Sequence, residues 1–397
     1  MTGEERRIIG VTSAAHGLNH GFVLVFSAVL PLLQRDFSTD YFHLGLIANV
    51  CFFACGIGAL PSGMLADRIG PKRLITLYLF GAAFSSFLVA ASGSLLALGV
   101  FIGLLGLFCS TYHPASNALI SWGIKRRGKG FGIHGVSGTL GVALTPVAAG
   151  ILASLLGWKA TYAVFGIAGV AAGVASLSLP AAPQKEPTDT TKEPASLKNT
   201  QGALPFLMVF YASTAMAGLC YWGVLTFLPT YMAQRVHIDF LPMGSVALGG
   251  MMSTIALLSG TIGQYVGGTL SDRYPSERVY FAAYLLGAPF LFFVGLSTGL
   301  FLVLSALAYA FFYFSTETTG VHLLARHISL RFRGTGYGIH FLLNFGVGSF
   351  AATLAGYIAD RFGLEWVFHT MGLSFVGAGV LAFVLIVLSP TKPSVHA

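Results

Sequence analysis

The sequence predicts an all-α membrane protein with twelve transmembrane helices in two six-helix halves, and three observations support this prediction. The 397 residues are 55% hydrophobic and 9% charged, with a mean hydropathy of +0.77, which is too apolar for a water-soluble protein. One polar segment, 181–202, divides the apolar stretches six and six. A basic, glycine-rich phrase in the first half also returns in the second half.

Each apolar stretch is long enough to cross a bilayer as a helix. Roughly 18 to 25 residues, rising ~1.5 Å each, span the ~30 Å of hydrocarbon. The segment 181–202 is rich in proline, threonine and charge, which is typical of a solvated linker between domains 1–180 and 203–397. The predicted spans are 11–33, 43–65, 74–92, 96–122, 130–155, 160–180, 203–232, 245–270, 279–296, 298–325, 335–359 and 366–388.

The positions of lysine and arginine predict the orientation, because basic loops resist translocation. If the N-terminus is cytoplasmic, 18 of the 22 basic residues lie on the inner side. The remaining four are Arg35, Lys159, Arg235 and Arg361. We therefore expect both termini in the cytoplasm of a cell with a bacterial-type inner membrane. The net charge of +8 then reflects orientation, and nucleic acid is not an expected partner because no soluble basic face with interleaved aromatics is present.

Two phrases repeat between the halves. "RGKGFGIH" at 127–134 returns as "RGTGYGIH" at 333–340, and "GMLADR" at 63–68 pairs with "GTLSDR" at 268–273. The sequence therefore predicts two related bundles, and secondary transporters commonly build a central binding cavity between such repeats.

The segment "GMLADRIGPKR", residues 63–73, resembles the signature of the major facilitator superfamily in the loop between helices 2 and 3. The copy in the second half departs from the pattern, with Pro275 in place of a glycine and Glu277 in place of a base. The resemblance covers the whole chain and implies the fold of that superfamily and a secondary transporter. The signature positions are Gly63, Asp67, Arg68, Gly70, Lys72 and Arg73, with Asp272 and Arg273 in the second copy.

A second resemblance concerns helix 5, which is similar to the motif of proton-coupled antiporters in the superfamily. Thr145 and Ala149 replace glycines of that motif, and plain helix packing through small residues is the alternative interpretation. "HGLNH" in helix 1 and "YHPASNALIS" in helix 4 resemble the group that includes fosmidomycin resistance exporters. The positions that match the helix 5 motif are Gly132, Gly141, Pro146 and Gly150.

In the family fold, the loop between helices 2 and 3 lies beside the start of helix 11, and the loop between helices 8 and 9 lies beside the start of helix 5. Asp67 is therefore expected to face "RGTGYGIH" and Asp272 to face "RGKGFGIH". A carboxylate near a helix N-terminus is stabilised by ~0.3–1 kcal/mol. Our hypothesis is that both pairs act as latches, which close the cytoplasmic side and break when the bundles rock inward.

Glu317 is the acid that lies well within a predicted span, in "YFSTETTG". An ionisable group in a membrane costs several kcal/mol unless it is paired or hydrated. The surrounding hydroxyl groups can hydrogen-bond either protonation state, which suits a proton carrier. Structural hydrogen bonding is the alternative role.

Polar residues also form stripes on two other helices. His16, Asn19 and His20 share one face of helix 1, and His113 and Asn117 share one face of helix 4. In the family fold, helices 1, 4, 7 and 10 line the cavity. These stripes are therefore expected to meet Glu317 around one pocket for a small amphipathic solute, with Tyr211, Tyr221 and Trp222 from helix 7.

The histidines have several possible roles. His16, His20 and His113 are expected to exchange protons together with Glu317, and each of them can instead make an interhelical hydrogen bond. His134 and His340, one turn inside the membrane, either hydrogen-bond within the latches or face the cavity and titrate. Metal transport is less favoured, because the second intramembrane carboxylate expected for a hard or borderline cation is missing.

No enzyme or cofactor motif is expected. "GIKRRGKG" at 123–130 has the spacing of a phosphate-binding loop, but Gly130 stands where Ser or Thr must hold magnesium. The leading hypothesis is a monomeric, proton-coupled exporter of a small organic compound that works by rocking of its two halves. An uptake symporter for an organic acid is the alternative, and a non-transporting receptor is disfavoured because it needs no intramembrane carboxylate.

Overall fold

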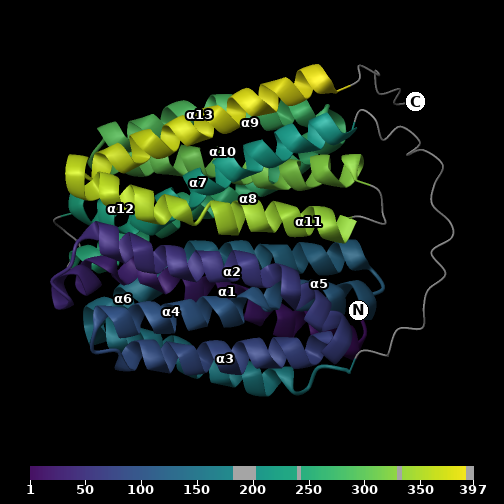
Figure 1. Ribbon diagram of the computed structural model, residues 1–397, viewed down its shortest axis with the longest axis horizontal. Helices are drawn as coiled ribbons and strands as arrows, with labels where there is room; N and C mark the ends of the chain where they lie inside the picture. Colours follow the sequence, from purple (N-terminus) through teal and green to yellow (C-terminus); the bar gives the residue numbers. More distant parts are fainter. Residues whose placement is uncertain (182–202, 239–242, 329–332, 390–397) are drawn as a thin grey trace.

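The computed structural model describes residues 1–181, 203–238, 243–328 and 333–389. Residues 182–202 of the predicted linker 181–202 lie outside these ranges. The helices of the first half form one layer, below that of the second half in Figure 1. The first half contains α1 (Gly3–Asp36), α2 (Tyr41–Ile69), α3 (Pro71–Ala91), α4 (Leu95–Ser110), α5 (Tyr112–Gly123) and α6 (Arg127–Ser176). The second contains α7 (Ala203–Arg235), α8 (Ser245–Arg273), α9 (Ser276–Leu296), α10 (Gly299–His327), α11 (Arg333–Phe341), the π-helical turn η3 (Leu342–Val347), α12 (Phe350–Phe362) and α13 (Leu364–Leu388).

The described helices make twelve crossings of a membrane. Eleven segments are long and apolar enough to span one, and one of them, Lys129–Ser176 in α6, has 48 residues. At ~1.5 Å per residue this is far too long for a single crossing of ~30 Å. Gly157 interrupts the helix with φ 81° and ψ 164°, a conformation that glycine adopts readily, so α6 provides two spans.

Two predicted spans are broken rather than continuous. The predicted span 96–122 divides at Thr111 into α4 and α5, just before Pro114. Span 335–359 divides at η3. There, Gly346 packs against Gly56 of α2, and Gly348 packs against Gly218 of α7. The approach is so close that a methyl group on Gly56 or Gly348 would overlap the facing backbone. These close backbone approaches depend on neighbouring helices, so the hydropathy of the segment alone does not predict them.

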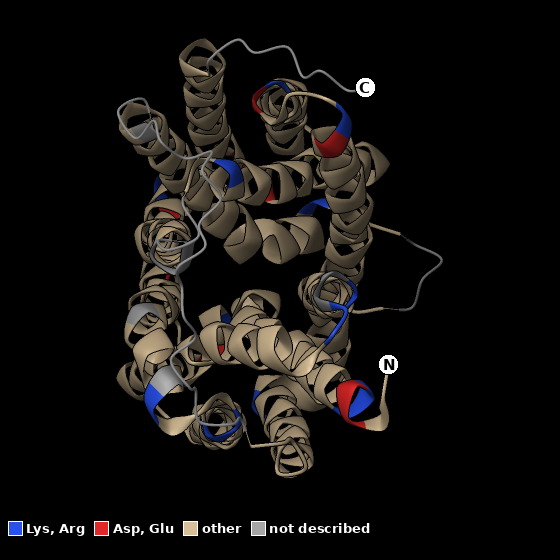
Figure 2. Cartoon of the chain, turned by 90° about the vertical axis from the view of Figure 1, so that its right-hand side faces the viewer, with Lys and Arg blue, Asp and Glu red and all other residues tan. Residues whose placement is uncertain are grey.

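The helix directions define two ends of the molecule. We call the end where α1 begins and α13 ends the terminal end, and the opposite one the far end (Figure 1). Figure 2 looks onto the terminal end, where lysine and arginine positions, in blue, occur at several helix ends. Among the described basic residues, the ones at the far end are Arg35, Lys159, Arg235 and Arg361, as the sequence predicts.

The two halves pack against each other along two antiparallel helix pairs, α2 with α12 and α6 with α8. Asn49 Nδ2 donates to Thr353 Oγ1 across the first pair (3.1 Å). In the second pair, the Val147 backbone N–H donates to Thr254 Oγ1 (3.2 Å). These contacts lie toward the far end, so the halves are joined there.

Candidate functional site: a histidine-lined central cavity

A cavity of about 530 Å³ lies between the two halves. It extends from the middle of the helices toward the terminal end, because its lining begins near Val23 and Gly56 and reaches Met64, Asn117 and Tyr337. The full lining is Asn19, His20, Val23, Cys55, Gly56, Ala59, Gly63, Met64, Cys109, Ser110, His113, Pro114, Asn117, Trp222, Tyr337, Gly338, Phe341 and Phe345.

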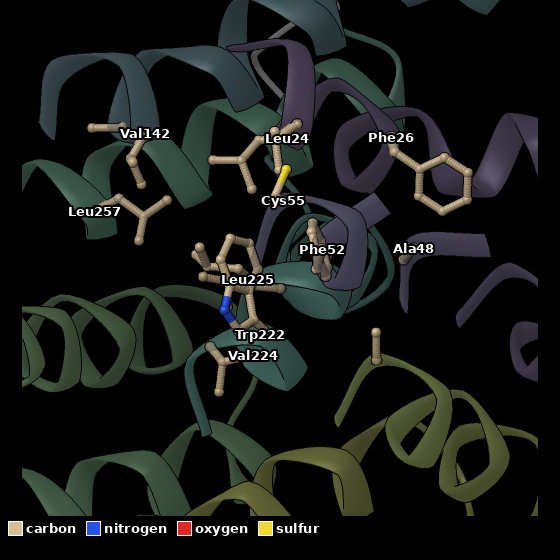
Figure 3. Close-up of a cluster of buried hydrophobic side chains, with 14 of the residues drawn as sticks. Leu24, Phe26, Ala48, Phe52, Cys55, Val142, Trp222, Val224, Leu225 and Leu257 are labelled. Carbon is tan, nitrogen blue, oxygen red and sulfur yellow. The ribbon is translucent and has the colours of Figure 1, made fainter. Parts of the chain in front are cut away.

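Packed apolar side chains close the cavity toward the far end. Trp222 of α7 lines the cavity, lies 4.1 Å from Phe52 between ring centroids and donates its indole N–H to the Asn344 carbonyl (3.0 Å). Figure 3 shows it among buried side chains from both halves, including Leu24 and Leu225. The cavity is therefore open toward one end of the molecule and blocked near the middle.

A carboxylate holds the halves together at the far end. Asp360 of α12 accepts hydrogen bonds from the backbone N–H groups of Tyr41 (3.1 Å) and Phe42 (2.7 Å), at the start of α2. Gln234 of the second half also donates to the Tyr41 hydroxyl (3.1 Å). We call Asp360 with its two N–H donors the far-end clasp. A carboxylate is stabilised there because the free N–H groups of a helix start carry partial positive charge.

The sequence analysis missed the clasp, although a signal for it exists. "ADRFG" at 359–363 repeats "ADRIG" at 66–70, and both phrases end a helix at a glycine with positive φ, 87° at Gly70 and 102° at Gly363. The Asp-Arg-x-Gly pattern therefore marks Asp360 as a second helix-end carboxylate, at the end of the molecule opposite to the predicted latches.

Four histidines gather in the first half, beside the cavity. The His16 ring lies 5.0 Å from His20, 5.1 Å from His113 and 4.2 Å from His134 between centroids, and it stacks on His134. His16 Nδ1 donates to the His134 carbonyl at 2.7 Å. His20 and His113 line the cavity, whereas His16 and His134 lie buried behind them. We call these four residues the histidine cluster.

Local sequence explains how the cluster assembles. His16 and His20 are one helical turn apart on α1, and His113 follows the break between α4 and α5. A methyl group on Gly138 of α6 would overlap the His16 ring, so Gly138 provides the space that His16 occupies. The predicted stripes on helices 1 and 4 do meet, and α6 completes the cluster.

Gly138→Ala is expected to lower the free energy of unfolding by about 1–3 kcal/mol, because the added methyl group displaces the His16 ring from a packed site. Thermal unfolding of the purified protein in detergent measures this loss. Gly135→Ala on the same helix is the matched control, since nothing lies within 4 Å of its added methyl group. It should leave stability unchanged or raise it by up to about 1 kcal/mol through helix propensity. Equal effects of the two variants would contradict the packing role of Gly138.

Glu317 is not part of the cavity lining, which corrects the expectation of a single pocket. It lies on α10, half-buried, and accepts a hydrogen bond from the Tyr313 hydroxyl (2.9 Å). Tyr221 stacks on Tyr313 (4.9 Å), and both line a separate void of about 10 Å³. Glu317 therefore belongs to an aromatic cluster inside the second half. The described cavity wall on that side is provided by α11 and η3, together with Trp222 of α7.

The other predicted cavity residues divide between lining and structural positions. Asn117 and Trp222 line the cavity. Asn19 also lines it and donates to the Cys109 carbonyl (3.0 Å), which ties α1 to the end of α4. Tyr211 does not line it, and its hydroxyl donates to the Gly336 carbonyl (3.1 Å).

His134 and His340 occupy equivalent places in the two repeated phrases but have different neighbours. His134 packs on His16, whereas His340 stacks on Phe210 (5.9 Å) and lies 3.3 Å from Thr214 through Nδ1. Neither lines the cavity. Each contacts the first helix of its own half. Among the described residues, neither histidine makes the predicted latch hydrogen bond and neither faces the cavity.

The latch residues lie at the terminal end, at the ends of α2, α3 and α8. Gly63 lines the cavity and Gly70 makes the turn between α2 and α3. Arg68, Lys72 and Arg73 belong to this turn, and the side chain of Asp67 lies outside the described residues. Asp272, followed by Arg273, is 76% exposed, with Oδ1 at 3.9 Å from His322 Nδ1 of α10. The predicted latches stay a hypothesis for another conformation, since residues of both α2 and α11 line the cavity here.

The helix 5 motif contributes to packing at two different interfaces. Gly141 lies against Gly17 of α1, within the first half. Pro146 and Gly150 lie against α8, where a methyl group on Gly250 would overlap the Pro146 carbonyl. Gly132 has no atom within 4 Å of an added methyl group. The packing interpretation therefore accounts for three of the four motif positions.

Comparison with known proteins identifies the family. Residues 12–353 and 243–397 match the model of the Major Facilitator Superfamily. The chain belongs to the Major Facilitator Superfamily. The relative named Probable sulfoacetate transporter SauU, from Cupriavidus necator, is 23% identical over 96% of this chain and 93% of its own length. The Fosmidomycin resistance protein of Escherichia coli K12 is 25% identical over 91% of this chain and 88% of its own length.

Solved structures confirm the fold. The crystal structure of a bacterial homologue of the human lysosomal transporter Spinster, in an inward-facing and occupied conformation, matches with a TM-score of 0.82 at 15% identity. The match covers 98% of this chain and 100% of that chain. The predicted fold class and family are confirmed, as is the similarity to the fosmidomycin resistance group. This superfamily member is an integral membrane transporter and not an enzyme.

Proposed function

We propose that this transporter exports a small organic compound in exchange for protons, by alternating access of one central cavity. The observation that carries the proposal is a cavity that opens toward one end, is blocked by Trp222 and is closed beyond it by the far-end clasp. This arrangement is one of the two states that alternating access requires. The opposite state follows if the clasp opens and the terminal ends of α2 and α11 meet.

Proton coupling is assigned to Glu317. It is a half-buried carboxylate inside a span, and an intramembrane acid is costly unless it is paired or hydrated, so its presence favours a functional role. Its hydrogen bond from Tyr313 is available whether the carboxyl group is charged or neutral. The histidine cluster provides a polar wall for the solute in the opposite half. The proton site and the solute site then lie in different halves.

We place the terminal end in the cytoplasm of a bacterial-type inner membrane, with both domains, 1–180 and 203–397, in one monomer. The excess of basic residues at that end supports this orientation. The cavity is then open to the cytoplasm, which is where an exporter loads its solute.

Uptake of an organic acid with protons is the second candidate. The described residues that line the cavity include two imidazoles and two amides, and no acidic side chain; the four are His20, His113, Asn19 and Asn117. Such a wall accepts an anion without charge repulsion. The similarity to a relative named for sulfoacetate transport also favours this candidate, just as the similarity to a resistance protein favours export.

Proton flux in proteoliposomes tests the proposal. With an internal pH indicator and an imposed proton gradient, we expect one member of a panel of organic acids and antibiotics to trigger proton movement. Protons moving against the direction of the solute support exchange, and protons moving with it support the uptake symporter. A labelled solute that crosses without any proton movement would contradict coupling in both forms.

A further inference from the structure

We propose that His16, His20 and His113 bind a divalent transition-metal ion, such as Zn²⁺, and that the cargo is a complex of this ion with a carboxylate-bearing solute. The inference rests on the proposed transport through the central cavity and names its substrate class. It goes beyond the sequence analysis, which disfavoured a metal because a second intramembrane carboxylate is missing.

The geometry of the three rings carries the proposal. One ligand nitrogen from each of the three histidines lies within 4.8 Å of the other two. Three imidazoles that bind Zn²⁺ at about 2.0–2.1 Å have nitrogens separated by about 3.3 Å, so small side-chain rotations bring the three nitrogens into place. Two of the ligands, His20 and His113, face the cavity. An ion that enters the cavity therefore reaches the site directly.

The hydrogen bonds around the rings also suit a metal. His16 Nδ1 donates to the His134 carbonyl at 2.7 Å, so this ring keeps its lone pair on Nε2. Histidines that bind metals commonly donate their other N–H to a carbonyl in this way. Among the described residues, no hydrogen bond to the ring nitrogens of His20 or His113 is found. These two are therefore not the satisfied interhelical histidines of the alternative interpretation.

The charge of the cavity identifies the solute. None of the described residues that line it is Asp, Glu, Lys or Arg. A divalent ion on three neutral imidazoles keeps its full charge in a membrane cavity, which is costly. Zinc with three histidine ligands also keeps a fourth position open. A carboxylate oxygen of the solute can fill this position and neutralise part of the charge, so the missing protein carboxylate is supplied by the cargo.

Cobalt binding to the purified full-length protein in detergent tests the site. Tetrahedral Co²⁺ absorbs visible light far more strongly than octahedral Co²⁺ and serves as a probe for Zn²⁺. We expect one Co²⁺ per chain, displaced by Zn²⁺. His20→Ala and His113→Ala should each lower the affinity for Co²⁺ by at least about tenfold. Loss of a residue that only supports a metal ligand already lowers metal affinity about 10- to 100-fold. Malonate should change the spectrum of the bound ion, because it occupies the open position.

Matched variants make the test specific. His43→Ala removes an exposed histidine at the far end, where it contacts Asp40, and should leave the spectrum unchanged. If an alanine variant does not fold, the near-isosteric His113→Gln replaces it. A spectrum that is the same in wild type and in both cavity variants, or no bound Co²⁺ at all, would overturn the metal site. A histidine-dependent spectrum that malonate does not alter would overturn the carboxylate cargo.

The binding test is independent of transport. No gradient is present, so Glu317→Gln should bind Co²⁺ as the wild type does. A wild-type protein that binds Co²⁺ but shows no solute-triggered proton movement would contradict only the proposed function. A wild-type protein that couples protons to solute but shows no histidine-dependent Co²⁺ binding would contradict only this inference.

Discussion

Substitution of Asp360 by alanine is expected to open the far end of the transporter and shift its population away from the state described here. The variant removes both hydrogen bonds of the far-end clasp, which join α12 to the start of α2. Hydrogen bonds to a charged group contribute about 1.5–3 kcal/mol each, and the exposure of Asp360 reduces this. A loss of about 1.5 kcal/mol in total changes the ratio of the two states roughly tenfold. Asp360→Asn should have a smaller effect, because its amide oxygen still accepts one bond.

Distances between spin labels at positions 96 and 300 measure this change. Leu96 and Leu300 are 80% and 73% exposed and lie at the far end in opposite halves. Asp36→Asn is the matched control, since Asp36 accepts from the Trp158 indole within the first half and, among the described residues, makes no hydrogen bond or ion pair with the second half. The label distance should increase in Asp360→Ala and stay constant in Asp36→Asn. The same distance distribution in Asp360→Ala and wild type would show that the clasp does not hold this state.

The twelve crossings and the basic terminal end could be predicted because both follow from local composition. Span length depends on hydropathy, and orientation depends on the positions of charged residues between spans. The repeated Asp-Arg-x-Gly phrase marks the carboxylate of the clasp, but its partners could not be predicted. Its carboxylate and its N–H donors are separated by 318 and 319 residues, and the donors are backbone groups that carry no signal in the sequence.

The same distinction applies to the site. The stripe of His16 and His20 is visible in the sequence because helical spacing alone places them on one face. The position of Glu317 depends instead on which helices surround the cavity, and the broken helix around η3 contributes that wall where α10 was expected. The repeated phrase shows this most directly. His134 meets an imidazole on α1, but His340 meets Phe210 on α7, so a similar local sequence produces a polar cluster in one half only.

Glu317→Gln is expected to abolish proton coupling while solute exchange continues. Glutamine has nearly the same volume, and its amide oxygen can still accept the Tyr313 hydroxyl, so the aromatic cluster around it should keep its packing. It cannot gain or lose a proton near neutral pH. In proteoliposomes, solute-triggered proton movement should fall at least about tenfold, to the level of empty liposomes. Exchange of labelled for unlabelled solute, which needs no proton, should remain close to wild type.

The comparison of these two rates separates a proton site from a structural residue. Loss of both rates would indicate that Glu317 supports the fold or the solute site, because a purely structural defect does not spare exchange. Glu4→Gln, at an exposed position near the start of α1, is the matched control and should leave both rates unchanged. Wild-type proton movement in Glu317→Gln would contradict the assignment directly. Selective loss would require coupling to pass from Glu317 to the cavity, since Glu317 lies outside it. The contact of Trp222 with Phe52 joins the two halves at the cavity wall, and the hydrogen bond of Trp222 to Asn344 ties α7 to η3 within the second half.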